Sequence, residues 1–137
     1  MSANPKADIH YAPRNELPAA QRKDLVGGWE IFGDVVACRF AFKLGGSPHH
    51  PVFTANGSGG LVVSQTPGTL DVFDIASRTK SASVKVGTMP HWIGLSGGRA
   101  FVTNENSGDL SVVDLASNSV MDTLPVGNGP RKIVVQP

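Results

Sequence analysis

A repeat of about 40 residues constrains the fold of this chain more than any other feature of its sequence. The motif GGSP begins at Gly45, GTMP at Gly87 and GNGP at Gly127, so the three anchors are 42 and 40 residues apart. An apolar run follows each anchor, and in the two complete copies a glycine turn and three more strand-sized segments come after it. We therefore expect a repeated unit of four strands. The alternative, unrelated hairpins of a β-sandwich, does not explain the matched spacing.

The residues between the strand-sized segments support this interpretation. Gly97-Gly98, Ser107-Gly108 and Asn118-Ser119 tolerate the positive φ angles of tight hairpin turns. Four short strands repeated every 40 residues or so are typical of a propeller blade, whose small sheet buries one face against the next blade. The sequence thus predicts an all-β fold, a partial β-propeller of four-stranded antiparallel blades with a short N-terminal helix or irregular arm.

The predicted organisation divides the chain into an arm and a row of blades. Residues 1–28 form the arm, in which Asn15 is a plausible helix cap and Gly27-Gly28 a plausible stop. The predicted blade region covers residues 29–137. Within it, 29–44 are the outer strands of a partial blade with a hairpin at Gly33-Asp34, 45–86 and 87–126 are complete blades, and 127–137 is the inner strand of a further blade.

The second repeat carries a family resemblance. Its sequence GTMPHWIGLSGGRAFVTNENSGDLSVVDLASNSVMDTLPVG resembles the YVTN-type β-propeller repeat, with FVTN at the place of the eponymous tetrapeptide. The resemblance is strong from Gly87 to Pro137, fair from Gly45 to Val86 and absent before about Gly33. Where that family usually has SPDG after the inner strand, this chain has SGG and TANGSGG. Proteins similar to this repeat family include lactonases, amine dehydrogenase heavy subunits and haem d1 domains of nitrite reductases.

Composition excludes several classes of function. Twelve lysines and arginines against eleven aspartates and glutamates leave a net charge of +1, which argues against binding to nucleic acid. Cys38 is the single cysteine, so neither an internal disulfide nor a cysteine-rich structural zinc site is expected. Apolar runs such as VVACRFAF are too short to span a membrane, so no membrane insertion is expected.

The residues after the anchor prolines are the strongest candidates for a binding site. His49 and His91 directly follow Pro48 and Pro90, Arg131 follows the third anchor proline, and His50 is next to His49. In a propeller this position opens the inner strand near the channel, so the side chains would converge where an anion, a cofactor carboxylate or a metal could bind. The alternative is that each histidine only closes a local hydrogen bond. A zinc site is not expected, because no third ligand is evident.

Two other motifs have structural explanations. GLSGG, residues 94–98, matches the G-x-S-x-G pattern of a hydrolase nucleophile, but that motif needs a helix after the turn, and RAFVTNE predicts a strand. Asp74 and Asp114 recur forty residues apart. We expect them to accept hydrogen bonds from the turns that follow them rather than to act as an acid/base pair.

These observations favour a non-catalytic binding or scaffold module, either complete or a fragment of a longer propeller, without an evident cofactor. The alternative is a part of a propeller enzyme of the kinds named above. The partner would be a protein or a small molecule, and a homo-oligomer could arise by completion of the partial blade. The N-terminal sequence lacks the apolar core of a secretory signal, which as written indicates the cytoplasm, although similar proteins are often periplasmic or secreted.

Overall fold

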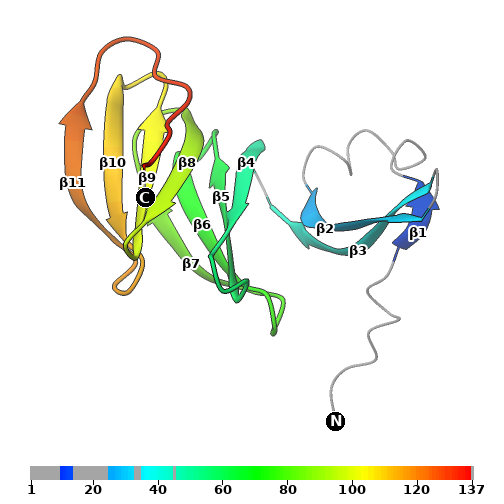
Figure 1. The fold of residues 1–137 in the computed structure, drawn as a ribbon. Helices are drawn as coiled ribbons and strands as arrows, with labels where there is room; N and C mark the ends of the chain where they lie inside the picture. The colour runs from blue at the N-terminus through cyan, green and yellow to red at the C-terminus, as the bar shows by residue number, and fades with distance from the viewer. Residues whose placement is uncertain (1–9, 14–24, 33–34, 45, 137) are drawn as a thin grey trace. The chain divides into compact units, whose positions relative to one another are not determined.

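A computed structural model describes residues 10–13, 25–32, 35–44 and 46–136 of the chain (Figure 1). The chain divides into two compact units, residues 1–45 and 46–137. The described residues form eleven strands and no helix, so the all-β prediction is confirmed. Accordingly, this part of the chain has no helix that could cross a bilayer.

The first unit contains a sheet of three strands. Strand β1 spans His10–Pro13, β2 Leu25–Phe32 and β3 Val35–Lys43, and their order in the sheet is β1-β3-β2. β2 and β3 pair antiparallel from Leu25 opposite Lys43 to Phe32 opposite Val35, as the predicted hairpin requires.

The N-terminal predictions are corrected in two places. Most of the predicted short helix lies outside the described residues, but its expected stop, Gly27-Gly28, lies within β2. The glycines therefore sit at a strand position, where the ladder register shifts between Gly28 and Trp29. β1, which pairs with the middle of β3, was not predicted because its four residues carry too short a pattern.

The second unit consists of two four-stranded antiparallel sheets, which we call the first and second blades. The first blade has the order β4-β5-β6-β7, with β4 at Pro48–Phe53, β5 at Gly59–Ser64, β6 at Thr69–Asp74 and β7 at Thr79–Lys85. The second has β8 at Pro90–Ser96, β9 at Arg99–Asn104, β10 at Asp109–Asp114 and β11 at Ser119–Pro125. This is the architecture of a partial propeller.

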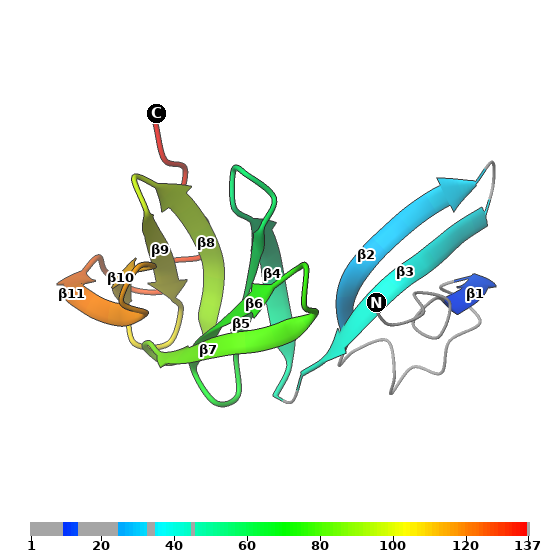
Figure 2. The ribbon, with the colours of Figure 1, turned by 90° about the horizontal axis from the view of Figure 1, so that it is seen from below.

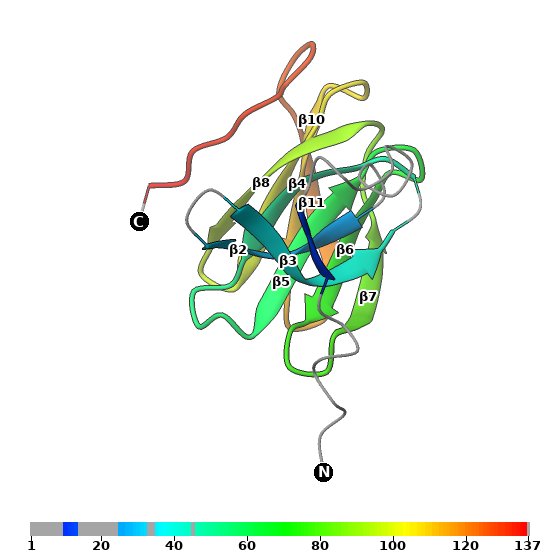
Figure 3. The same cartoon turned by 90° about the vertical axis from the view of Figure 1, so that its right-hand side faces the viewer.

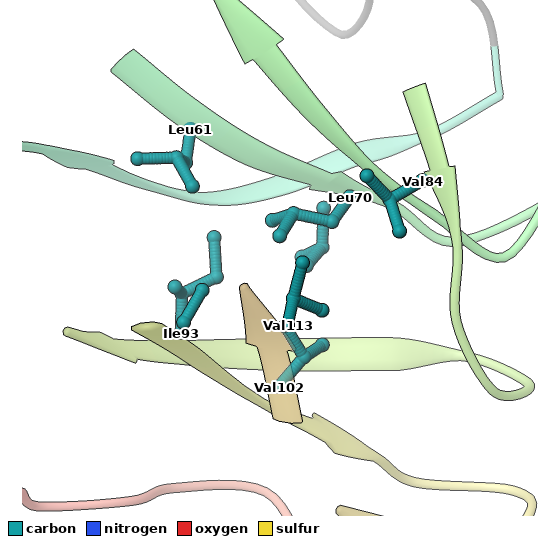
Figure 4. Packing of buried hydrophobic residues seen from close by; sticks show 8 residues of the cluster. Leu61, Leu70, Val84, Ile93, Val102 and Val113 are labelled. Carbon is teal, nitrogen blue, oxygen red and sulfur yellow. The ribbon is translucent and has the colours of Figure 1, made fainter. Parts of the chain in front are cut away.

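The two blades stack face to face (Figure 2), with β8 against β4 and β5, and β11 against β7. The apolar core lies between them (Figure 4). It consists of Leu61, Val63, Leu70 and Val84 from the first blade and Ile93, Ala100, Val102 and Val113 from the second. Alternate residues of each strand point to opposite faces of a sheet, so one face of each blade supplies this core.

The alternation of strand residues in the second repeat predicts a core of Phe101, Val102, Leu110, Val112 and Val113, with Trp92 and Ile93 packed near the inner strand. The structure buries these residues to different degrees. Val102, Val113, Ile93 and Val112 are buried as expected. Phe101, Leu110 and Trp92 are only half-buried. Phe101 and Leu110 lie on the face of the second blade that points away from the first, because Phe101 is adjacent to Val102 and Leu110 pairs with Thr103.

The two blades differ in the length of one turn. Four residues, 55–58, connect Thr54 to Gly59 between β4 and β5, and two residues, Gly97 and Gly98, connect β8 to β9. The side chain of Asn56 holds the longer turn, accepting hydrogen bonds from the Thr54 hydroxyl and from the Ser58 amide. The two additional residues account for the unequal spacing of the anchors, and the strand register on either side is unchanged.

The segment after β11 differs from the prediction of an inner strand. Residues 126–136 form no strand and run as an irregular trace, drawn in orange and red in Figure 3. In the described part of the chain, no strand pairs with this segment, so its backbone does not belong to a sheet. It nevertheless contacts β8, because a Cβ atom on Gly94 would lie 2.7 Å from Val135 Cγ2 and 3.3 Å from Ile133 Cγ2.

Candidate functional site

The candidate residues lie at equivalent positions at the start of the inner strands. His49 and His50 lie in β4, His91 and Trp92 lie in β8, and Arg131 lies in the segment after β11. Ser47 and Met89, which precede the strand prolines, adopt positive φ angles of 57° and 54°. Their carbonyls accept hydrogen bonds from the amides of Gln65 and Glu105, so both inner strands begin in the same way.

One row of hydrogen bonds joins the three successive repeats. His49 Nδ1 donates to the carbonyl of His91 at 3.0 Å, and His91 Nδ1 donates to the carbonyl of Arg131 at 3.2 Å. A carbonyl oxygen only accepts, so both imidazoles carry a proton on Nδ1 and, when neutral, a lone pair on Nε2. The buried hydroxyl of Thr103 also donates to the Arg131 carbonyl, at 3.0 Å. We call this row, His49, His91 and Arg131, the hydrogen-bonded row.

A second row consists of the next residue in each repeat. The rings of His50 and Trp92 stack with centroids 3.5 Å apart and planes 16° from parallel. Lys132 places its ammonium 5.6 Å from the centroid of the Trp92 ring, within the range of a cation–π interaction. We call His50, Trp92 and Lys132 the stacked row. The two rows lie side by side, because the His49 and His91 rings are 4.4 Å apart and Trp92 is adjacent to His91.

Glu105 connects the charged groups at one end of the site. Its Oε1 accepts hydrogen bonds from Arg131 Nε at 3.0 Å and from Nη2 at 2.9 Å. Its Oε2 lies 3.9 Å from His91 Nε2. The Glu105 side chain is 20% exposed, whereas that of Arg131 is 67% exposed. The carboxylate therefore orients a guanidinium that remains largely open to solvent.

The environment keeps one histidine of the site uncharged at neutral pH. Partial burial lowers the pKa of His50 below its ordinary value, and the nearby His49 and His91 lower this pKa further because their positive charges would repel its own. A neutral imidazole stacked on an indole is an apolar surface with a polar edge. The face of His50 turned away from Trp92 suits a flat ring, and the guanidinium of Arg131 suits an anionic group.

The structure brings all four predicted residues into this region, but in two rows rather than one ring. His49, His91 and Arg131 are linked through backbone carbonyls, while His50 belongs to the stacked row. Sequence reasoning placed Trp92 only in the core and missed Glu105 and Lys132. Repeat spacing identifies Trp92 and Lys132 as the equivalents of His50. Among the described residues, no three His, Cys, Asp or Glu side chains are placed to hold a metal ion.

The GLSGG motif and the pair Asp74 and Asp114 have the structural roles that the sequence predicts. Strand β9, not a helix, follows Ser96, so GLSGG is not a nucleophile elbow. Asp74 accepts a 2.7 Å hydrogen bond from the Ser77 amide and Asp114 a 3.1 Å bond from the Ser117 amide. Hydrogen bonds from these serines lower the pKa of both carboxyl groups. The two aspartates cap equivalent turns of different blades.

Several solved structures have a fold similar to that of this chain. A candidate 6-phosphogluconolactonase from Bacteroides fragilis matches with 19% identity and a TM-score of 0.69, over 85% of this chain and 40% of its own. The periplasmic gluconolactonase PpgL of Pseudomonas aeruginosa matches with 22% identity and a TM-score of 0.64, over 78% and 35%. The dihydro-heme d1 dehydrogenase NirN matches with 20% identity and a TM-score of 0.53, over 69% and 22%.

The chain spans less than half the length of each of these three proteins. No family model matches the sequence, and no curated protein matches it. At identities below a quarter, the likeness concerns the fold and not the activity. The matches agree with the stacked four-stranded sheets of residues 46–137, and they show that the chain has a propeller-type fold.

Proposed function

We propose that this chain is a non-catalytic binding module built from YVTN-type propeller repeats, and that its ligand is a small molecule with a flat ring and an anionic group. One observation carries the proposal: residues from three successive repeats converge on one place. In the stacked row the face of His50 turned away from Trp92 offers a flat surface, and Arg131, next to Lys132 in the C-terminal segment, offers an exposed guanidinium. Binding sites of this kind combine apolar surface with a few oriented polar groups.

The hydrogen bonds of the site favour binding over catalysis. Both histidines of the hydrogen-bonded row use Nδ1 to hold backbone carbonyls of the next repeat. Glu105 accepts the Arg131 hydrogen bonds through Oε1, and its Oε2 lies 3.9 Å from His91 Nε2, too far for a hydrogen bond, so the two do not form an acid/base pair. The side chains are therefore fixed in position as a recognition surface.

Trp92 provides a direct measurement of ligand binding. In a Trp29→Phe chain, tryptophan fluorescence reports on Trp92 alone, because the chain has two tryptophans. Benzoate should quench this fluorescence saturably, whereas cyclohexanecarboxylate, with the same charge but no flat ring, and inorganic phosphate should bind more weakly. Calorimetry on the unmodified chain provides a second measurement that does not depend on the Trp29 substitution.

Two variants separate the proposed site from a general charge effect. Arg131→Gln should weaken benzoate binding by roughly tenfold, the effect expected for loss of one charge-assisted contact. Arg99→Gln removes the same charge at the opposite end of the strands, where Arg99 pairs with Ser96, and should leave binding unchanged. The proposal fails if benzoate does not bind, or if the two variants weaken its binding equally.

The second candidate is a part of a propeller enzyme. It is supported by the similar structures, which include a gluconolactonase and a dihydro-heme d1 dehydrogenase. The low pKa of His50 would also leave an uncharged imidazole available as a base at neutral pH. Hydrolysis of δ-gluconolactone by the purified chain, lost in His50→Phe, would favour this candidate. An absorbance band of haem after purification would favour it as well.

A further inference from the structure

The second blade and the segment after it carry most of the exposed apolar side chains of the described residues. Within residues 44–136, the structure describes six large hydrophobic side chains as exposed. Phe53 lies in the first blade, and the other five are Val120, Met121, Leu124, Val126 and Val134. Of these, Leu124 lies on the face of the second blade that points away from the first, because it pairs with Leu110, whereas Val120 pairs with Val113 on the opposite face.

The face concerned is the one that points away from the first blade. We call it the outward face, and it consists of Phe101, Thr103, Leu110, Val112 and Leu124. The strand register defines it: Val112 pairs with Phe101, and Leu110 pairs with both Thr103 and Leu124. The opposite face of the same sheet supplies Ala100, Val102 and Val113 to the core between the blades.

The first blade shows what such a face does when it is covered. The equivalents of Phe101, Leu110 and Leu124 are Leu61, Leu70 and Val84, which the second blade covers. Leu70 is fully buried and Val84 is 6% exposed, whereas Leu110 is half-buried and Leu124 is 42% exposed. The outward face therefore continues the established interface between the blades, but Leu110 and Leu124 in its outer part remain partly exposed.

The C-terminal segment covers only the inner part of this face. Ile133 and Val135 pack over Gly94, at the positions where Ile93 and Leu95 of β8 pack against the first blade. The carbonyl of Arg131 accepts the His91 hydrogen bond as the carbonyl of His91 accepts that of His49. Val134 points away and is 93% exposed. On the outer strands Val112 is 9% exposed, but Leu110 of β10 and Leu124 of β11 remain accessible to solvent.

We propose that the outward face is a docking surface for a second copy of this chain, and that the two copies pack through the same face. A partner that fits must offer an apolar sheet face, as the second blade does to the first. The outward face of a second copy is such a face, and the pairing of two like faces gives a symmetric dimer that closes on itself.

Sedimentation velocity on the full chain tests this dimer. The wild-type chain should shift from monomer to dimer as its concentration rises through the micromolar range. Leu124→Lys should weaken the dimer roughly a hundredfold, because the pair contains two copies of Leu124 and each lost contact costs about tenfold. Phe53→Lys changes an exposed apolar side chain of the first blade, 57% exposed against 42% for Leu124, and should leave association unchanged.

A gain of affinity provides a further measurement. Asp122 pairs with Val112 and places a charge on the outward face, where the first blade has Ala82. Asp122→Ala should therefore tighten the dimer. Circular dichroism of each variant distinguishes lost association from lost folding.

Three outcomes would overturn the proposal. The first is a monomer at every concentration, and the second is association that Leu124→Lys leaves unchanged. The third is a dimer that survives Leu124→Lys but is lost when residues 131–137 are deleted, which would instead indicate completion of the three-stranded sheet by strand exchange.

Discussion

At the scale of single residues, His50 couples the candidate site to pH. Because its pKa is lowered in the folded chain, the folded state binds a proton there less readily than the unfolded state does. The resulting stability is fully present above the ordinary histidine pKa of about 6.5 and is lost as pH falls through that value towards the lowered one. His50 should therefore destabilise the fold in mildly acidic solution.

The first prediction concerns this residue. His50→Phe retains a ring to stack on Trp92 but does not titrate, so its free energy of unfolding should fall less than that of the wild type between neutral and mildly acidic pH. Urea denaturation at a series of pH values measures both profiles, and the difference between them isolates His50 from the other histidines. Parallel profiles would show that the stacked histidine does not contribute to acid sensitivity.

At the scale of elements, the contact between β8 and the C-terminal segment depends on a glycine. Gly94 leaves room for Val135, whose Cγ2 would lie 2.7 Å from a Cβ at this position. The segment has no strand partners in the described chain and is held by the hydrogen bonds at Arg131 and by its packing on β8, so a clash at Gly94 can displace it without breaking a β-ladder. The hydrogen bond from His91 to the Arg131 carbonyl would then lengthen.

The second prediction follows from that contact. Gly94→Ala should displace the segment, so that proteases cleave within residues 126–136 faster while the melting temperature of the blades changes little. Ser96→Ala, at the exposed end of the same strand, is the control and should leave the cleavage rate unchanged. Equal cleavage rates in Gly94→Ala and the wild type would mean that the segment is not held at this position.

The elements also show which features the sequence could predict. Alternation of apolar residues and glycine turns located all eight strands of the two blades, because both signals are local. The repeat spacing placed His49, His91 and Arg131 at equivalent positions. It could not predict that His50 stacks on Trp92, since this contact depends on the distance between two blades. Glu105 was missed for the same reason, because its partner Arg131 is 26 residues away.

At the scale of the whole second unit, the two blades share one core. Leu70 of the first blade is fully buried in that core, together with Val102 and Val113 of the second. In repeat proteins much of the stability resides in such interfaces between neighbouring units. A cavity in this core should therefore destabilise both blades, although the substitution lies in one.

The third prediction tests that coupling. Leu70→Ala should lower the free energy of unfolding by about 2–5 kcal/mol, the range for a large side chain removed from a packed core. In a Trp29→Phe background, Trp92 fluorescence follows the second blade, and its transition should move with that of the circular dichroism signal. Val120→Ala, at a partly exposed position of β11, should change stability by less than about 0.5 kcal/mol. An unshifted Trp92 transition in Leu70→Ala would indicate that the blades unfold independently.

The longer turn between β4 and β5 offers a place where a label can be inserted. Two additional residues between β4 and β5 leave the strand pairing unchanged, so this position already accommodates a change in chain length. Asn56 and Gly57 are exposed there, at the end of β4 opposite the candidate site. A fluorophore or an affinity tag inserted after Gly57 should therefore leave both ligand recognition and self-association undisturbed. The turn is a natural attachment point for immobilising the protein or for following it by single-molecule methods.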